Sequence, residues 1–402
     1  MDRDACIDEV DPGGFGRFSV ASSPTGTTVH PAMASLEEQA LEVLANLKEP
    51  SLDRTLGELG MLGRLRADSG RLIVPLKLSN PAYAGKEQLA DTIRHALEAL
   101  AGVTHVEIDW QVEAKGREIS ADDPVPGVKN VILVMSGKGG VGKSTVAANL
   151  ALALKRMGAR VGLLDADIYG PSVPTMFGIN GRPQSDGQRI EPLQRFGVKL
   201  MSIGFLLDDP KSAVVWRGPM LHGALLQFLK DVAWGNLDYL LLDLPPGTGD
   251  VALTLAQRVS TTGAVIVTTP QEVALIDVYK SVSMAQKVGI KVLGVVENES
   301  YFVCDGCDKR HEIFGSGGGQ KVAEHAEAPL LGQIPMEPSV REWGDAGTPV
   351  VQASPGSAIA KAFQDVAEQL VQAVDATHEG RAGAGFTIDR SGGQNRRLPV
   401  AR

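Results

Sequence analysis

A glycine-rich loop in the middle of the chain carries the clearest chemical signal. Residues 137–144 read Gly-Lys-Gly-Gly-Val-Gly-Lys-Ser and fit the pattern G-x-x-x-x-G-K-S between an apolar run and a helical pattern. Glycines let backbone N–H groups curl around phosphate oxygens, while Lys143 would reach the β and γ phosphates and Ser144 would ligate Mg²⁺. The loop therefore predicts a nucleoside triphosphate site rather than a simple turn. The residues expected to contact the nucleotide are Gly137, Lys138, Gly139, Gly140, Val141, Gly142, Lys143, Ser144 and Thr145.

Acidic residues follow two further apolar runs. Asp165 and Asp167 lie in Leu-Asp-Ala-Asp-Ile-Tyr-Gly-Pro, and Asp243 lies in Leu-Asp-Leu-Pro-Pro-Gly-Thr-Gly-Asp. Carboxylates at the carboxyl edge of a parallel sheet can orient the attacking water or hold the hydration shell of Mg²⁺. Asp243 suits Mg²⁺ through water, and Gly247 can offer its N–H to the γ phosphate. Each aspartate taken alone could instead cap a helix.

A C-x-x-C pair, Cys304 and Cys307, predicts a soft metal centre. Two thiolates are too few, because zinc or an iron-sulfur cluster usually takes four ligands, and Cys6 lies in a segment expected to be disordered. We therefore expect two chains to contribute one pair each across a two-fold axis. The alternatives are a redox dithiol, a zinc site with His311 as a third ligand, and two incidental cysteines.

The pattern after residue 129 alternates short apolar runs with helical stretches. Strands that are apolar on both faces and separated by helices predict a doubly wound α/β domain with a mostly parallel sheet. The ends of its strands would bring the loop and the acidic residues to one edge. The expected strands are 130–135, 160–165, 198–203, 238–243, 263–268, 291–297 and 329–334, and the expected helices are 143–157, 219–233, 249–259, 273–288 and 356–375.

A small α+β domain is expected before this α/β domain. Its pattern predicts helices over 35–47, capped by Ser35, and 86–101, with strands over 71–78 and 103–112. The predicted organisation is a disordered leader over 1–32 (or a true start at Met33), the small domain over 33–115, a linker over 116–128, the α/β domain over 129–376 and a disordered tail over 377–402.

Composition restricts the setting in which the protein works. The chain has 39 Lys and Arg against 48 Asp and Glu, for a net charge of −9, which disfavours nucleic acid or anionic lipid as the main partner. No apolar run is long enough to span a membrane, and the first residues lack the pattern of an export signal. Only three cysteines in 402 residues cannot form a disulfide framework. We expect a cytoplasmic protein.

The extra lysine in the loop adds a resemblance. Lys138 directly after the first glycine is similar to the deviant Walker A loop of the nitrogenase-reductase, MinD and ParA superfamily, whose members sandwich ATP between two subunits. The resemblance implies that Lys138 stabilises transferred charge on the partner's nucleotide, as an arginine finger would. It also implies that Asp167 positions water with Asp165 in support, and that Asn298 reads the adenine base. The alternative for Asn298 is a turn residue.

Four further motifs make the resemblance specific. The segments Asp-Ala-Asp-Ile-Tyr-Gly-Pro-Ser, Asp-Leu-Pro-Pro-Gly-Thr-Gly-Asp, Tyr-Phe-Val-Cys-Asp-Gly-Cys and Ile-Phe-Gly-Ser-Gly-Gly-Gly, with the loop, resemble the Mrp/ApbC family of iron-sulfur cluster carrier ATPases over about residues 129–375. The sequence departs from that family at Glu299 and at 305–306. The resemblance implies a homodimer that hydrolyses ATP, holds a 4Fe-4S cluster between subunits on the cysteine pairs, and passes it to apo-proteins. Catalytic roles would fall to Lys138, Lys143, Asp167 and Asp243.

Two other functions are alternatives to the cluster carrier. One is a MinD- or ParA-like positioning ATPase, and the other is a zinc-stabilised dimeric ATPase without a cluster. The small domain resembles the SufT-like iron-sulfur assembly domain, but Glu49 and Tyr83 stand where that family has Asp and Cys. Because that thiol is missing, we expect the small domain to serve in docking rather than in metal handling.

Overall fold

The computed structural model of this chain describes residues 35–49, 54–78, 81, 85–112, 114–167, 170–206, 218–247, 249–304 and 306–383. The expected leader and most of the expected tail lie outside these residues, as do Cys6 and Tyr83. Within the described part, no helix is both long and apolar enough to cross a membrane.

The small N-terminal unit is a three-stranded sheet with helices. Its elements are α1 (Leu36–Asn46), β1 (Arg66–Asp68), β2 (Arg71–Leu78), α2 (Lys86–Glu98) and β3 (His105–Val112), with β2 central, antiparallel to β1 and parallel to β3. Ser35 caps α1 as predicted: the Glu38 N–H donates to Ser35 Oγ (3.2 Å), and the Ser35 N–H donates to Glu38 Oε2 (2.8 Å). Apolar side chains of both helices and of β2 form a separate buried core.

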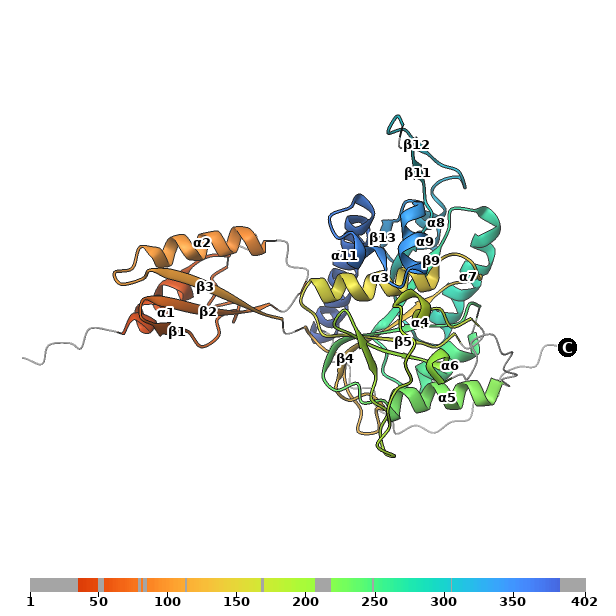
Figure 1. The fold of residues 1–402 in the computed structure, drawn as a ribbon, viewed down its shortest axis with the longest axis horizontal. Helices are drawn as coiled ribbons and strands as arrows, with labels where there is room; N and C mark the ends of the chain where they lie inside the picture. Colours follow the sequence, from red (N-terminus) through yellow and green to blue (C-terminus); the bar gives the residue numbers. More distant parts are fainter. Residues whose placement is uncertain are drawn as a thin grey trace, which may run out of the picture.

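An eight-stranded sheet organises the larger domain (Figure 1). Its strand order is β13-β10-β9-β4-β8-β5-β7-β6, parallel throughout except for the edge strand β6. The predicted doubly wound α/β fold is confirmed. The strands are β4 (Val128–Met135), β5 (Val161–Asp165), β6 (Leu193–Arg195), β7 (Val198–Ser202), β8 (Leu237–Asp243), β9 (Gly263–Thr268), β10 (Val292–Glu297) and β13 (Leu330–Gln333).

Helices cover both faces of this sheet, and alternate residues of each strand serve the two layers. In β4, Ile132 and Val134 pack with α3 and α11, whereas Val131 and Leu133 pack with α5, α6, α7 and α8. The helices are α3 (Lys143–Arg156), α4 (Val173–Met176), α5 (Gly218–Asp231), α6 (Gly249–Arg258), α7 (Glu272–Lys287), α8 (Gly318–His325), α9 (Pro338–Asp345), α10 (Val350–Ala353) and α11 (Ala358–Gly383), with a 3₁₀ turn η1 (Ile203–Leu206).

The structure differs from the sequence prediction at both ends of this domain. Residues 116–128, expected as a linker, contain a fully buried ion pair between Arg117 and Asp123. The segment joins the domain because Val125 packs in the domain's core and the Leu237 N–H donates to the Gly127 carbonyl (3.0 Å). At the other end α11 continues to Gly383, past the expected boundary at 376. His378 lies 2.9 Å from Asn130 Oδ1, so tertiary contacts extend into the expected tail.

A small hairpin lies between β10 and α8, in a stretch where no strand or helix is predicted. It consists of β11 (Phe302–Val303) and β12 (Arg310–His311), and it projects from the body of the domain in Figure 1. Strands of two residues leave no periodic pattern in a sequence. The hairpin is the element that carries the C-x-x-C pair.

Candidate functional site

The glycine-rich loop joins β4 to α3, as its motif requires. Gly140 (φ +83°) and Gly142 (φ +76°) adopt left-handed conformations that side chains rarely tolerate. Gly137 lies so close to α7 that a Cβ there would come within 2.3 Å of the Asp277 carbonyl carbon. The loop borders a cavity of about 250 Å³ at the amino end of α3, which we call the phosphate cavity. The N–H groups of the first helical turn and the helix dipole favour phosphate there. Lys138 lies on this loop with an exposed side chain.

Below this cavity, Lys143 forms a buried ion pair with Asp243 at the end of β8. Burial raises the pKa of Asp243, and the neighbouring ammonium of Lys143 opposes that shift. The second carboxylate oxygen, Oδ2, is buried and accepts no hydrogen bond from the described residues. An anionic oxygen with free lone pairs beside Ser144 fits a hydrated Mg²⁺, so the residues present suit the metal that accompanies a nucleoside triphosphate.

Asp165 and Asp167 occupy different environments at the end of β5. Asp165 is fully buried and accepts hydrogen bonds from Ser202 Oγ (3.0 Å) and from the N–H groups of Asp167 (3.1 Å) and Val173 (3.2 Å). Burial, with the nearby charge of Asp243, raises the pKa of Asp165 to about 7. Asp167 is half-buried and lines the phosphate cavity. The hydrogen bond from the Asp167 N–H therefore links the backbone of Asp167 to the buried Asp165.

Gly247 does not present its N–H to the cavity in this structure. The group donates to the Ser136 carbonyl (3.1 Å), and the adjacent Pro246 lines the cavity instead. The expected contact with a γ phosphate therefore requires the segment after β8 to change its hydrogen bonding.

Asn298, at the end of β10, contacts the loop directly. Its Nδ2 donates to the Val141 carbonyl (3.0 Å), and a Cβ on Gly142 would lie 2.2 Å from that nitrogen. Because Nδ2 is engaged, Oδ1 is the atom of this amide that can accept a hydrogen bond from a base. The side chain is only 6% exposed and borders a second, larger cavity.

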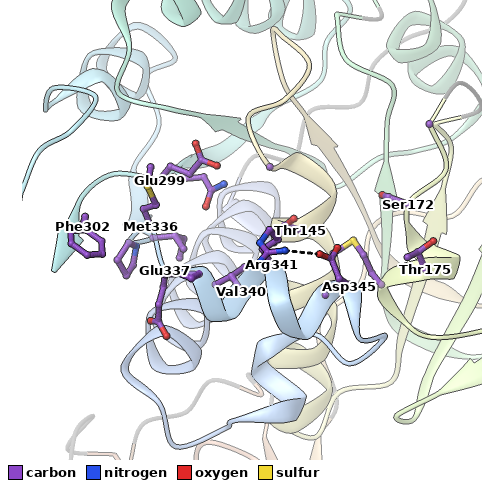
Figure 2. Close-up of a pocket in the computed structure, with 18 of the residues that line it drawn as sticks. Thr145, Ser172, Thr175, Glu299, Phe302, Met336, Glu337, Val340, Arg341 and Asp345 are labelled. Carbon is purple, nitrogen blue, oxygen red and sulfur yellow. Dashed lines mark hydrogen bonds and ion pairs between the residues drawn. The ribbon is translucent and has the colours of Figure 1, made fainter. Parts of the chain in front are cut away.

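This larger cavity adjoins the phosphate cavity and has a volume of about 830 Å³, which is within the usual range for a small-molecule site. The two cavities share Gly142, Thr145, Gly170, Ser172 and Met176. In Figure 2, Glu299, Phe302 and Met336 lie on one side of the cavity, and Ser172 and Thr175 lie on the other. A nucleotide with its phosphates at the loop would place its nucleoside here.

The cysteine pair lies at the turn of the β11–β12 hairpin. The Cys304 N–H donates to the Lys309 carbonyl (3.0 Å), and the N–H of Cys307 donates back to the carbonyl of Cys304 (3.3 Å). Cys304 is half-buried and Cys307 is exposed, and neither forms a disulfide with another described cysteine. Arg310 stacks on the Tyr301 ring, with 3.8 Å between the guanidinium carbon and the ring centroid. No cluster of three or more His, Cys, Asp or Glu suited to a metal occurs in the described part of the chain.

Two stretches of the chain match known families. Residues 127–371, more than half of the chain, match the ParA family described as NUBPL iron-transfer P-loop NTPase. The chain belongs to this family. A second family, iron-sulfur cluster assembly protein, matches residues 37–110 and so covers the small unit of the iron-transfer P-loop NTPase.

Similarity to individual proteins extends over both units of the iron-transfer P-loop NTPase. An iron-sulfur cluster carrier protein from Synechocystis sp. is 46% identical over 340 residues, covering 83% of this chain and 96% of the relative. One from Escherichia coli K12 is 44% identical over 341 residues, covering 84% and 92%. Among solved structures, a nucleotide-binding protein from Archaeoglobus fulgidus in complex with ADP is 44% identical, covers 55% of this chain and 87% of its own, and has a TM-score of 0.49.

The fold of this P-loop NTPase brings most of the predicted nucleotide residues to one edge of the sheet. The loop, Asp167 and Lys143 border the phosphate cavity, with Asp243 directly beneath, and Asn298 borders the larger cavity. The cysteines are separate from both cavities. In the small unit Glu49 is buried, 1% exposed.

Sequence reasoning missed the wall of the larger cavity that follows β13. Pro335, Met336, Glu337 and Arg341 contribute to that wall, and Arg341 Nη1 pairs with Asp345 (3.2 Å) on α9. The segment has no catalytic motif. Its only signal is its position, because it directly follows a strand expected to end at the same edge as the loop.

Proposed function

We propose that this protein binds Mg-ATP at residues 137–145 and carries an iron-sulfur cluster on Cys304 and Cys307 for delivery to apo-proteins. The observation that carries the proposal is the C-x-x-C pair at the turn of a projecting hairpin, on a P-loop NTPase whose relatives named iron-sulfur cluster carrier proteins match both units. Thiolates in such an accessible position can bind a metal centre and release it to another protein.

The residues around the phosphate cavity have separate roles in this proposal. Lys143 would leave Asp243 to bind the phosphates, and Asp243 would hold the hydrated Mg²⁺, which would neutralise charge on the phosphates. Asp167 positions the attacking water from the cavity wall. Asn298 Oδ1 accepts a hydrogen bond from the base.

A dimer completes both sites in this proposal. The hairpin of one chain offers two cysteines, whereas an iron-sulfur cluster usually takes four ligands. Lys138 is exposed, so it can reach a nucleotide held by another subunit. On α7, which packs against Gly137, the apolar side chains of Val273 and Ile276 are 71% and 61% exposed, and burial against a second copy would remove them from water.

Metal analysis of the reconstituted protein tests the proposal. After anaerobic reconstitution, the full chain should hold roughly four iron and four sulfide per two chains, with a charge-transfer absorption band. Cys304→Ser should lose this cluster, whereas the matched control Cys6→Ser should retain it. Stoichiometric zinc without sulfide would instead show a zinc-stabilised ATPase. ATP-dependent pelleting with liposomes or DNA, in a protein that takes up no cluster, would favour the positioning ATPase.

The role of ATP in delivery needs a separate test. Lys143→Ala should keep the cluster, because Lys143 lies under the phosphate cavity and not on the hairpin, but it should fail to transfer the cluster to an apo-acceptor. Transfer is followed by the acceptor's visible circular dichroism. Undiminished transfer by Lys143→Ala would discard the ATP-driven step.

A further inference from the structure

Phe302 lies between the larger cavity and a second space behind it. Its ring is half-buried and borders the 830 Å³ cavity, where Figure 2 shows it beside Met336 and Glu299. It also borders a cavity of about 410 Å³ whose far side is formed by Ala358 and Ala362 of α11. A side chain between two cavities can shift without displacing a packed neighbour, unlike a residue in a close-packed core.

The same residue is part of the hairpin that carries the cysteines. Phe302 pairs with His311 and Val303 with Arg310, and the Cys304 N–H continues the ladder to the Lys309 carbonyl (3.0 Å). Cys304 follows Phe302 by two residues, roughly 7 Å along an extended strand. A shift of Phe302 is therefore transmitted through paired backbone to Cys304.

The base of the hairpin is attached to the cavity wall. The Ser300 N–H donates to the Ile334 carbonyl (2.9 Å), and the N–H of Met336 donates to the carbonyl of Tyr301 (2.6 Å). These bonds join the entry strand to 334–336, the segment that forms the same wall as Phe302.

The segment that follows the hairpin is also held close to this wall, by the buried carboxylate of Glu297. Glu297 accepts hydrogen bonds from the Gly319 N–H at the start of α8, from Ser300 Oγ and from Gln333 Nε2. Glu297 is fully buried, and the next residue, Asn298, contacts the glycine-rich loop. The hairpin is thus anchored at both ends beside the nucleotide site.

We infer that Phe302 is the positioning residue through which nucleotide binding controls the cysteine pair. A nucleoside in the larger cavity confines the Phe302 ring, and this fixes the hairpin and the geometry of Cys304 and Cys307. When the cavity holds no nucleoside, the Phe302 ring is free to move, and Cys304 and Cys307 bind their cargo with a different affinity. The coupling is reciprocal, so cargo on the cysteines changes nucleotide affinity by the same factor. The inference rests on the proposed function for the identity of the cargo.

Thiol alkylation of the full chain tests the coupling without any cluster. Peptide mass spectrometry follows the alkylation rate of Cys304 and Cys307, separately from Cys6, with and without saturating MgADP. We expect MgADP to change the rate by about 5-fold or more in the unaltered protein, the lower end of typical coupling between sites. In Phe302→Ala, at an MgADP concentration that calorimetry shows to saturate the variant, this ratio should fall to about 1.

Matched variants separate positioning from a general loss of structure. Val303→Ala alters the neighbouring side chain, which is 40% exposed and borders only the second cavity, and should retain the full ratio. Phe302→Leu, which restores part of the apolar volume, should recover part of the MgADP effect on the alkylation rate. An unchanged ratio in Phe302→Ala, an equal loss in Val303→Ala, or no MgADP effect in the unaltered protein would overturn the inference. A protein that shows the coupling but takes up no cluster would overturn the proposed function and leave this inference standing.

Discussion

Lys143 and Asp243 form an ion pair in which both side chains are buried, 6% and 0% exposed. In the proposed function, the cation that would contact the phosphates is therefore held by the acid that would hold the hydrated Mg²⁺. On phosphate binding, Lys143 would exchange the carboxylate for a phosphate, and Asp243 would exchange the ammonium for the hydrated metal. Neither buried charge loses compensation in this exchange, which avoids the large cost of an unpaired buried ion.

Removing Lys143 should affect both binding and stability. Lys143→Ala is expected to abolish tight MgADP binding and to lower the free energy of unfolding by about 3 kcal/mol at pH 8, because it leaves the Asp243 carboxylate buried without its cation. Calorimetric titration and denaturant unfolding measure the two effects. Lys138→Ala is the matched control for stability, with an expected change within about 0.5 kcal/mol because Lys138 is exposed. Normal MgADP affinity in Lys143→Ala would refute the assignment.

Lys138 itself should matter for hydrolysis and not for binding within one chain. Lys138→Ala is expected to bind MgADP with an affinity within a few-fold of that of the unaltered protein. Its rate of ATP hydrolysis should fall by about 10³-fold, as when an arginine finger is removed. If the lysine acts on the partner's nucleotide, mixing this variant with Lys143→Ala should restore hydrolysis at one of the two sites of a mixed dimer. A mixture that stays inactive, although mixed dimers form, would place Lys138 on its own subunit's nucleotide.

The stability of the nucleotide-free protein should depend on pH through Asp165. The folded state raises the pKa of this carboxyl to about 7, chiefly by burial and further by the charge of Asp243. Between about pH 4 and that value the folded protein keeps a proton that the unfolded chain has released, so the free energy of unfolding falls as pH rises. Denaturant unfolding in EDTA from pH 5 to pH 8 measures this fall. Asp165→Asn should show a smaller one, and an identical pH dependence would disprove the attribution.

Substitution by alanine should weaken MgADP binding at one glycine of the loop and leave it nearly unchanged at another. Gly142→Ala introduces a Cβ at φ +76° and only 2.2 Å from Asn298 Nδ2, so it should disrupt the loop and weaken MgADP binding by about 10²-fold or more. At Gly139 the nearest atom to a new Cβ is Pro246 Cγ at 3.7 Å, an ordinary contact, so Gly139→Ala should keep the affinity within a few fold. Calorimetry on both variants decides; equal effects would show that the contact with Asn298 does not shape the loop.

The sequence identified most of the fold because its signals there are local. The strands of the large sheet are buried on both faces and therefore appear as continuous apolar runs, and the loop motif lies between a strand and a helix that its chemistry requires. Asp165, Asp167 and Asp243 were found because each directly follows such a run. Parallel strands then bring their ends to one edge without further information.

The parts that escaped prediction depend on contacts between residues far apart in the chain. Asn298 holds Val141 across 157 positions, and the last turns of α11 are fixed where His378 meets Asn130. The hairpin has strands of only two residues. Phe302 borders the larger cavity because residues 300–301, just before the hairpin, are hydrogen-bonded to 334–336. No periodic pattern or motif encodes these approaches, since each depends on the assembled sheet.

The molar mass of the cluster-loaded protein shows whether two chains share one cluster. Light scattering on anaerobically reconstituted protein, with iron and sulfide measured on the same fractions, gives the number of chains per cluster. We expect two chains for roughly four iron and four sulfide, and loss of both the cluster and the cluster-dependent dimer in Cys307→Ser. A single chain that retains a complete set of four iron and four sulfide would contradict this expectation.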